Sequence, residues 1–171
     1  PFQETPMAGR VNRKVYQQTL PGKRISSGCL LFDGAGRLLI VKPTYKEGWE
    51  IPGGTVNANE SPLAACIRET REELGLERRP LRLLSVDFSG ETKQRTESLN
   101  FIFDGGMLSA GEIAVIQLPE NELSEYRLLE PEEALKLLNR RLRRRVRRCL
   151  ALRDSPLTLY LEEQTSPWSV D

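Results

Sequence analysis

Four glutamates form the part of the sequence best suited to chemistry. Glu69, Glu72 and Glu73 are three or four positions apart, so on a helix their side chains project together, and Glu60 lies just ahead of them. Like charges at this spacing destabilise a helix by roughly 0.2–0.5 kcal/mol per pair, so the cluster favours a compensating cation. Arg68, four residues before Glu72, supplies one, and a divalent metal could supply the rest. An all-oxygen carboxylate site suits Mg²⁺, with Mn²⁺ as a substitute, rather than zinc.

The segment that must position these carboxylates is a predicted helix over residues 61–74. Ser61 is a favourable N-cap, and Pro62 suits the first helical position, where its missing N–H costs nothing. Gly75 suits the left-handed residue that follows a helix. The stripe expected to pack on a sheet consists of Leu63, Ile67, Thr70 and Leu74.

The sequence around this helix contains a longer motif. Residues 54–76 read GTVNANESPLAACIRETREELGL, which resembles the Nudix box, Gly-x5-Glu-x7-Arg-Glu-U-x-Glu-Glu-x-Gly-U, where U is bulky and apolar. The fixed positions are held by Gly54, Glu60, Arg68, Glu69, Glu72, Glu73, Gly75 and Leu76. Thr70, at the first U position, is the one departure, and it affects packing rather than chemistry. The preceding Trp-Glu-Ile-Pro-Gly-Gly at 49–54 is also similar to the lead-in found in that family.

The resemblance implies a fold, an activity and a set of roles. The fold is an α/β/α sandwich with a mixed β-sheet, and the activity is Mg²⁺-dependent cleavage of the pyrophosphate linkage of a nucleoside diphosphate joined to another group. The metal ligands would be Glu69, Glu72, Glu73 and the carbonyl of Gly53. Arg68 would orient Glu69, and Glu60 would be a further ligand or an anchor for the helix. The box residues Glu72, Glu73 and Arg68 are therefore the expected catalytic centre.

Other residues are candidates outside the box. In the Nudix family the catalytic base lies in the box or in a later loop. Glu125 and Glu122, ahead of the strand expected at 126–129, are the later candidates. Either one could also be an ordinary surface glutamate. Gly54 and Glu60 in the box, and Lys42 and Arg95 in or near loops, are expected to meet the substrate. The two cations could also be ordinary surface residues. The identity of the substrate is not readable from these residues.

Composition excludes several classes of enzyme. The 171 residues contain no histidine, which removes Ser-His-Asp and Cys-His nucleophiles and histidine zinc sites, so acid-base work falls to carboxylates, Lys, Tyr or metal-bound water. The three cysteines, Cys29, Cys66 and Cys149, are odd in number and lie among apolar residues, which favours core positions and a reducing, cytoplasmic location. Neither an apolar run of membrane-spanning length nor a signal-peptide pattern is present.

The order of elements indicates one domain. We expect a Nudix domain over 24–153, preceded by an arm or edge element at 1–23 and followed by a tail at 154–171 that could add an edge strand. The expected strands span 25–32, 38–41, 81–87, 99–103, 113–118 and 126–129. A second helix is expected from Pro131 to about Arg153, with apolar residues at helical spacing.

The distribution of arginines along this second helix indicates which partners to expect. The net charge is +1, yet seven arginines crowd residues 140–148. Apolar residues interleaved with them form one stripe, so the arginines are predicted to occupy a solvated face, with a phosphate or partner surface as the alternative. We expect a small-molecule diphosphate as partner, no membrane and no specific nucleic acid, and a homodimer stays open. The alternative function is a catalytically silent Nudix-fold module that binds a nucleotide or RNA.

Overall fold

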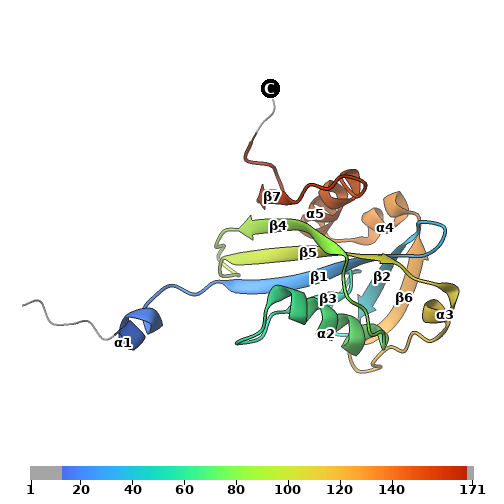
Figure 1. The fold of residues 1–171 in the computed structure, drawn as a ribbon, viewed down its shortest axis with the longest axis horizontal. Coiled ribbons are helices and arrows are strands. Elements are labelled where there is room, and N and C mark those ends of the chain that lie inside the picture. The colour runs from blue at the N-terminus through green and yellow to red at the C-terminus, as the bar shows by residue number, and fades with distance from the viewer. Residues whose placement is uncertain (1–12, 169–171) are drawn as a thin grey trace, which may run out of the picture.

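A mixed β-sheet forms the centre of the molecule (Figure 1). The computed structural model describes residues 13–168. The strands are β1 (Arg24–Phe32), β2 (Leu38–Pro43), β3 (Gly53–Thr55), β4 (Arg82–Ser89), β5 (Ser98–Met107), β6 (Leu123–Leu129) and β7 (Leu159–Glu162). Their order is β6-β2-β1-β5-β4-β7, and the short β3 pairs with β1 outside this path. β1 pairs with β5 and β4 with β7 in parallel, whereas the other pairs are antiparallel.

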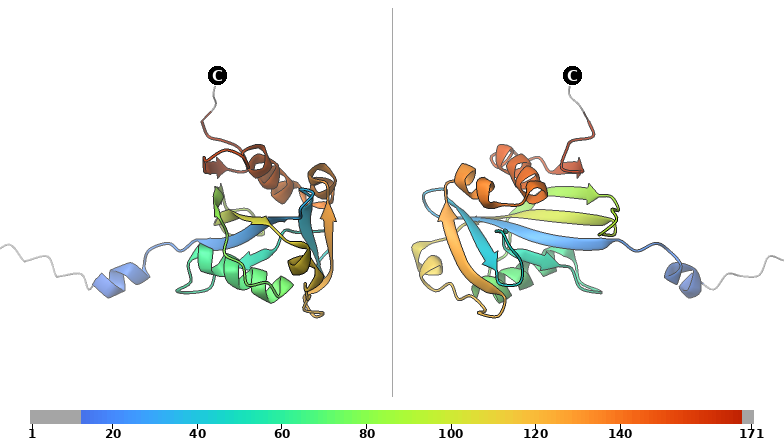
Figure 2. Two further views of the ribbon diagram at one scale, coloured as in Figure 1. Left: turned by 45° about the vertical axis from the view of Figure 1, so that its right-hand side comes forward. Right: turned by 180° about the vertical axis from the view of Figure 1, so that it is seen from behind.

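Helices cover both faces of this sheet (Figure 2). α2 (Pro62–Leu74) and α3 (Ala110–Ala114) lie on one face, and α4 (Pro131–Leu137) and α5 (Arg140–Ala151) lie on the other. Each face has its own buried cluster, because alternate residues of β1 and β2 point to opposite sides. The predicted α/β/α sandwich with a mixed sheet is confirmed. The short helix α1 (Arg13–Gln18) lies apart from the sandwich.

The caps of the glutamate-bearing helix α2 follow the sequence prediction, whereas its buried residues are Ala65, Cys66, Thr70 and Leu74 and the predicted Leu63 and Ile67 are half-buried. Ser61 accepts a hydrogen bond of 3.1 Å from the Ala64 N–H, and Gly75 is left-handed, with φ of 71°. Thr70, the one departure from the motif, is 1% exposed, and its hydroxyl donates to the carbonyl of Cys66 at 2.8 Å. A threonine is therefore accommodated against the sheet because its single polar group is satisfied within the helix.

The strand predicted at 113–118 is wrong. Its first residues belong to the helix α3, and residues 116–119 have no regular secondary structure. The Ser109 side chain accepts from the Glu112 N–H, and the Glu112 side chain accepts from the Ser109 N–H, so both ends of a capping box are satisfied. This local arrangement outweighs the apolar pattern on which the strand was predicted.

The single helix predicted from Pro131 to about Arg153 is also wrong, because two helices occupy this segment. Leu138 has extended backbone, and Asn139 then caps α5 by accepting from the N–H groups of Arg141 and Leu142. The Arg143 guanidinium donates to the carbonyl of Leu138, which stabilises the break. Asparagine is a strong N-cap, so the local sequence ends one helix and begins the next.

The prediction that the arginines form a solvated face holds for only some of them. Arg144 and Arg148 are exposed, but Arg145 is buried and donates from Nε and Nη2 to Asp87, at 2.8 and 2.6 Å. Asp87 also accepts from the backbone and side chain of Gln164, which follows β7. This buried carboxylate therefore joins α5 and the tail to the sheet.

The remaining composition-based expectations have mixed outcomes. All three cysteines are buried free thiols, as predicted. The first part of the predicted N-terminal arm, residues 1–12, lies outside the described residues. Within residues 13–168, every helix is too short or too polar to cross a lipid bilayer.

Candidate active site

Arg68 is the centre of an ionic cluster on α2. Its Nε donates to Oε1 of Glu60 at 2.8 Å, and its Nη2 donates to Oε2 of the same carboxylate at 3.0 Å. Its Nη1 donates to Glu69 at 2.7 Å and to Glu72 at 2.8 Å. The bidentate bond makes Glu60 the firmest partner, and the remaining donors hold two box glutamates in place.

This cluster shifts the acidities of its members in opposite directions. Hydrogen bonds from Arg68 and from the Asn57 N–H lower the pKa of Glu60 to about 2. The same bond to Glu60 raises the pKa of Arg68 above its usual value. Burial raises the pKa of Glu69, and repulsion from Glu72 and from Glu122 adds to this effect against the pull of Arg68. Glu60 is thus ionised at neutral pH, whereas burial disfavours the ionised form of Glu69.

Glu73 has no cationic partner among the described residues. It accepts one hydrogen bond, from the backbone N–H of Gly53 to Oε2 at 2.8 Å. Burial raises its pKa to about 8, and the nearby charges of Glu69, Glu50 and Glu122 contribute in the same direction. A carboxylate desolvated among other carboxylates is stabilised by a cation, and the described part of the chain places none beside it.

The two glycines of β3 lie in close contact with their neighbours. Gly53 has φ of 145°, and a Cβ there would collide with the backbone of β1. A Cβ on Gly54 would collide with the carboxylate of Glu69. Glycine is therefore required at 53 by the backbone of β1, whereas a side chain at 54 would displace the Glu69 carboxylate.

The donor set fits a hard divalent cation. Glu69 and Glu72 each use one oxygen on Arg68, and Glu73 uses one on Gly53, so each keeps an oxygen that accepts no hydrogen bond from the described residues. Carboxylate and carbonyl oxygens are what Mg²⁺ prefers. In residues 13–168 no three acidic or cysteine side chains already converge as a metal cage. The carboxylates that Arg68 holds would have to reorient toward a metal.

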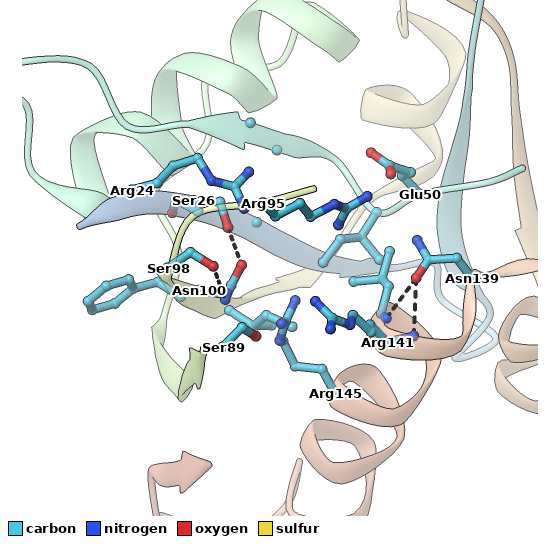
Figure 3. A pocket seen from close by; sticks show the side chains of 18 residues that line it. Arg24, Ser26, Glu50, Ser89, Arg95, Ser98, Asn100, Asn139, Arg141 and Arg145 are labelled. Atoms are coloured by element: carbon cyan, nitrogen blue, oxygen red, sulfur yellow. Dashed lines mark hydrogen bonds between the residues drawn. The ribbon is translucent and has the colours of Figure 1, made fainter. Parts of the chain in front are cut away.

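A polar cavity of about 190 Å³ lies on the other side of β3 (Figure 3). Its lining includes Gly53 and Gly54, together with Glu50 from the segment before them. Of the residues predicted to meet the substrate, Gly54 and Arg95 line it, whereas Lys42 and Glu60 are not among its lining residues, and a substrate contact for any of them stays a prediction. The glycine strand therefore separates the glutamate cluster from a cavity that can receive the rest of a ligand.

The two glutamates predicted to lie ahead of a strand have different surroundings, because β6 begins at Leu123 and already includes Glu125. Glu125 lies on β6, opposite Lys42 of β2, and its carboxylate pairs with Arg127 at 2.6 Å. Glu122 lies just before β6 and raises the pKa of both Glu69 and Glu73 by repulsion. A catalytic role for Glu125 and a substrate contact for Lys42 stay predictions.

The family comparison agrees with this geometry. A family model of the NUDIX domain matches residues 22–150. The chain belongs to the NUDIX family. An RNA pyrophosphohydrolase of Hydrogenovibrio crunogenus is 38% identical over 63 residues, which cover 37% of this chain and 38% of that protein. The chain thus matches well under half the length of this curated relative.

Solved structures show the NUDIX fold at lower identity. A MutT protein from Methanosarcina mazei superimposes with a TM-score of 0.64 at 23% identity, covering 81% of this chain and 100% of that one. The NUDIX domain of Shewanella oneidensis NrtR, solved with ADP ribose, gives a TM-score of 0.65 at 14% identity, covering 82% and 98%. These likenesses establish the fold of the NUDIX chain.

Sequence reasoning missed several residues of this site. Glu50 stands inside the motif's lead-in, so its position next to the two glycines was the available signal. Arg24, Asn100 and Arg141 line the cavity, but they come from β1, β5 and α5. No local pattern joins residues so distant in the chain, and the order of the strands together with the position of α5 on the sheet brings them together.

Proposed function

We propose that this NUDIX chain is a Mg²⁺-dependent hydrolase that cleaves the pyrophosphate linkage of a nucleoside diphosphate joined to another group. The observation that carries the proposal is the junction at β3. On one side, Glu73 is buried beside Glu69, and no cation of residues 13–168 pairs with it. On the other side lies a cavity with arginines in its wall. A metal at the glutamates would neutralise these carboxylates and bind the diphosphate, and the rest of the substrate would reach the arginines across β3.

In this proposal Mg²⁺ is held by Glu69, Glu72, Glu73 and the Gly53 carbonyl. The metal would neutralise the diphosphate and make the attacking water more acidic. The chain's own contribution is placement. Arg68, fixed by Glu60, limits the positions that Glu69 and Glu72 can take.

Removal of a proton from the attacking water is assigned to a carboxylate of the box or to one of two later glutamates, Glu122 before β6 and Glu125 within it. Glu122 is the loop candidate that the electrostatics favour, because its charge acts on Glu69 and Glu73. Glu125 is engaged by Arg127 in the structure but is retained in the proposal. Substitution of each by Gln compares the two directly, and the variant with the larger loss of turnover identifies the base.

The substrate would occupy both sides of β3. Gly54 and Arg95 meet it at the cavity, and Lys42 meets it from the end of β2. The name of the matched relative, an RNA pyrophosphohydrolase, supports cleavage of a phosphoanhydride. The NrtR domain was solved with a bound nucleotide derivative, so a binding module without turnover is the alternative that an assay must exclude.

A panel of nucleoside triphosphates, dinucleoside polyphosphates, nucleotide sugars and 5′-triphosphorylated oligonucleotides tests the proposal. Each compound is incubated with purified protein and millimolar Mg²⁺, and release of phosphate, pyrophosphate or nucleoside monophosphate is followed. The expected result is Mg²⁺-dependent release from at least one compound, abolished by EDTA and by Glu73→Gln. Binding without release from any compound would favour the silent module instead.

A further inference from the structure

From the charge of the cavity we infer that this site recognises a second phosphate of its substrate, separate from the diphosphate that is cleaved. This inference rests on the proposed function and specifies its substrate class. The phosphate would belong to the nucleoside part, as a 3′-phosphate monoester or as the first phosphodiester of an oligonucleotide. The residues that would contact it are Arg24, Arg95 and Arg141.

The cavity wall is strongly cationic. Among its lining residues are four arginines, Arg24, Arg95, Arg141 and Arg145, against a single acidic residue, Glu50. Figure 3 shows the side chains of Arg24, Arg95 and Arg141 directed toward the middle of the cavity. They come from β1, from the turn between β4 and β5 and from the first turn of α5. Three separate elements thus bring positive charge to one place.

Most of this charge is not neutralised by the residues that the structure describes. Arg145 is the exception, because its guanidinium is bound to Asp87. Arg141 has only a long contact of 4.0 Å with Glu163. Among the ion pairs of residues 13–168, none involves Arg24 or Arg95. Adjacent uncompensated guanidinium groups repel one another, and an anion placed among them removes this repulsion.

The uncharged part of the wall is polar and ordered. The Ser26 hydroxyl donates to Oδ1 of Asn100 at 2.8 Å, and the Asn100 amide donates to the Asp87 carbonyl at 3.1 Å. Phe101 is the only aromatic residue among those that line the cavity. A wall with one aromatic ring and several guanidinium groups suits a phosphorylated sugar better than a stacked base.

The position of the cavity separates the second phosphate from the reacting one. Gly53 belongs to the cavity wall and also donates to Glu73 of the glutamate cluster. A diphosphate at the glutamates therefore continues past β3 into the cavity through its nucleoside. The arginine group meets that nucleoside rather than the phosphates at the glutamates.

Binding without turnover gives the direct test. Adenosine 3′,5′-bisphosphate and adenosine 5′-monophosphate share the base and the 5′-phosphate, so their difference isolates the 3′-phosphate. Calorimetric titration at low ionic strength in EDTA should show about 10-fold to 100-fold tighter binding of the bisphosphate, since charge-assisted bonds are worth about 1.5–3 kcal/mol. Equal affinities, or no binding of either, would overturn the inference.

Matched variants assign the effect to the cavity. Arg141→Gln should lose most of the preference for the bisphosphate. Arg148→Gln, exposed on the same helix and absent from the cavity wall, should keep it. Arg24→Gln and Arg95→Gln should each weaken it as well. If the preference persists in all three cavity variants, the phosphate is bound elsewhere and the inference is wrong.

Turnover with Mg²⁺ separates this inference from the proposed function and distinguishes the two sources of phosphate. ATP, its 3′-phosphorylated derivative and a 5′-triphosphorylated dinucleotide are compared by kcat/KM. Faster turnover of one phosphorylated compound identifies monoester or phosphodiester as the preferred form. Equal turnover of all three would contradict this inference but would agree with the proposed hydrolase activity. Absence of Mg²⁺-dependent turnover of every compound on the wider panel would contradict the hydrolase activity itself.

Discussion

The backbone N–H of Gly53 donates a hydrogen bond of 2.8 Å to Oε2 of Glu73, and this bond joins β3 to the glutamate helix α2. Gly53 also lines the arginine cavity. One residue therefore belongs to both halves of the candidate site. In the proposed function, this relationship would let the NUDIX chain hold a metal and a nucleoside on opposite sides of a strand of three residues.

Loss of either late box glutamate should abolish most activity. Glu72→Gln and Glu73→Gln keep the size of the side chain but remove the charge that we propose holds Mg²⁺ against the diphosphate. We expect turnover to fall by a factor of about 10²–10⁴, or about 2.7–5.5 kcal/mol of barrier. The control is Glu77→Gln, just beyond α2, whose side chain is 74% exposed. Near-normal turnover in both box variants would contradict the catalytic assignment.

Divalent metal should stabilise the folded protein. Burial, with added repulsion from neighbouring carboxylates, raises the pKa of Glu69 and Glu73, and Mg²⁺ or Mn²⁺ should stabilise their charged forms by binding the folded state selectively. At ten times its dissociation constant the metal adds about 1.4 kcal/mol, which corresponds to a rise in Tm of about 3–6 °C. Differential scanning calorimetry measures this rise, and Glu73→Gln should reduce it. An unchanged Tm of the wild type at millimolar metal would argue against the site.

The buried pair of Asp87 and Arg145 should be essential for stability. Asp87→Ala leaves the Arg145 guanidinium buried without its partner, and such a change costs about 3–5 kcal/mol. Urea denaturation measures the loss. Arg148→Ala, on the exposed face of the same helix, should stay within about 0.5 kcal/mol of the wild type. If Asp87→Ala unfolds at the same urea concentration as the control, the pair does not anchor α5.

Asp33 should make stability depend on pH in the acid range. Burial alone raises the pKa of Asp33, but hydrogen bonds from Arg37 and from the Ala35 N–H outweigh it and lower the pKa below its usual value. A group with a lowered folded pKa contributes stability that is present above its unfolded pKa, about 3.9, and lost as pH falls through the folded pKa.

The comparison with Asp33→Asn isolates this contribution, because other carboxylates titrate alike in both proteins. The free energy of unfolding of the wild type should exceed that of the variant at neutral pH, and the difference should shrink below about pH 4. Urea denaturation at a series of pH values measures it. A difference that stays constant across the acid range would show that the charge of Asp33 contributes nothing.

Local features of this chain could be predicted from the sequence because their causes are local. The cap at Ser61, the left-handed Gly75 and the common side of Glu69 and Glu72 depend on spacing along a single helix. Errors arose where two local patterns competed. The apolar stripe predicted one continuous helix, but the Asn139 cap begins a separate second helix. The Ser109 capping box likewise begins a short helix where a strand was predicted.

The sequence by itself determined the chemistry available to this protein: carboxylates without histidine, spaced to gather on one helix beside two glycines. Only the tertiary structure decided which of these groups are desolvated. Burial under β3 raises the pKa of Glu73 to about 8, and packing of α5 on the sheet buries Arg145 and turns Arg141 toward the cavity. Burial depends on which distant segments cover a side chain, and the spacing of residues along the sequence does not predict those segments.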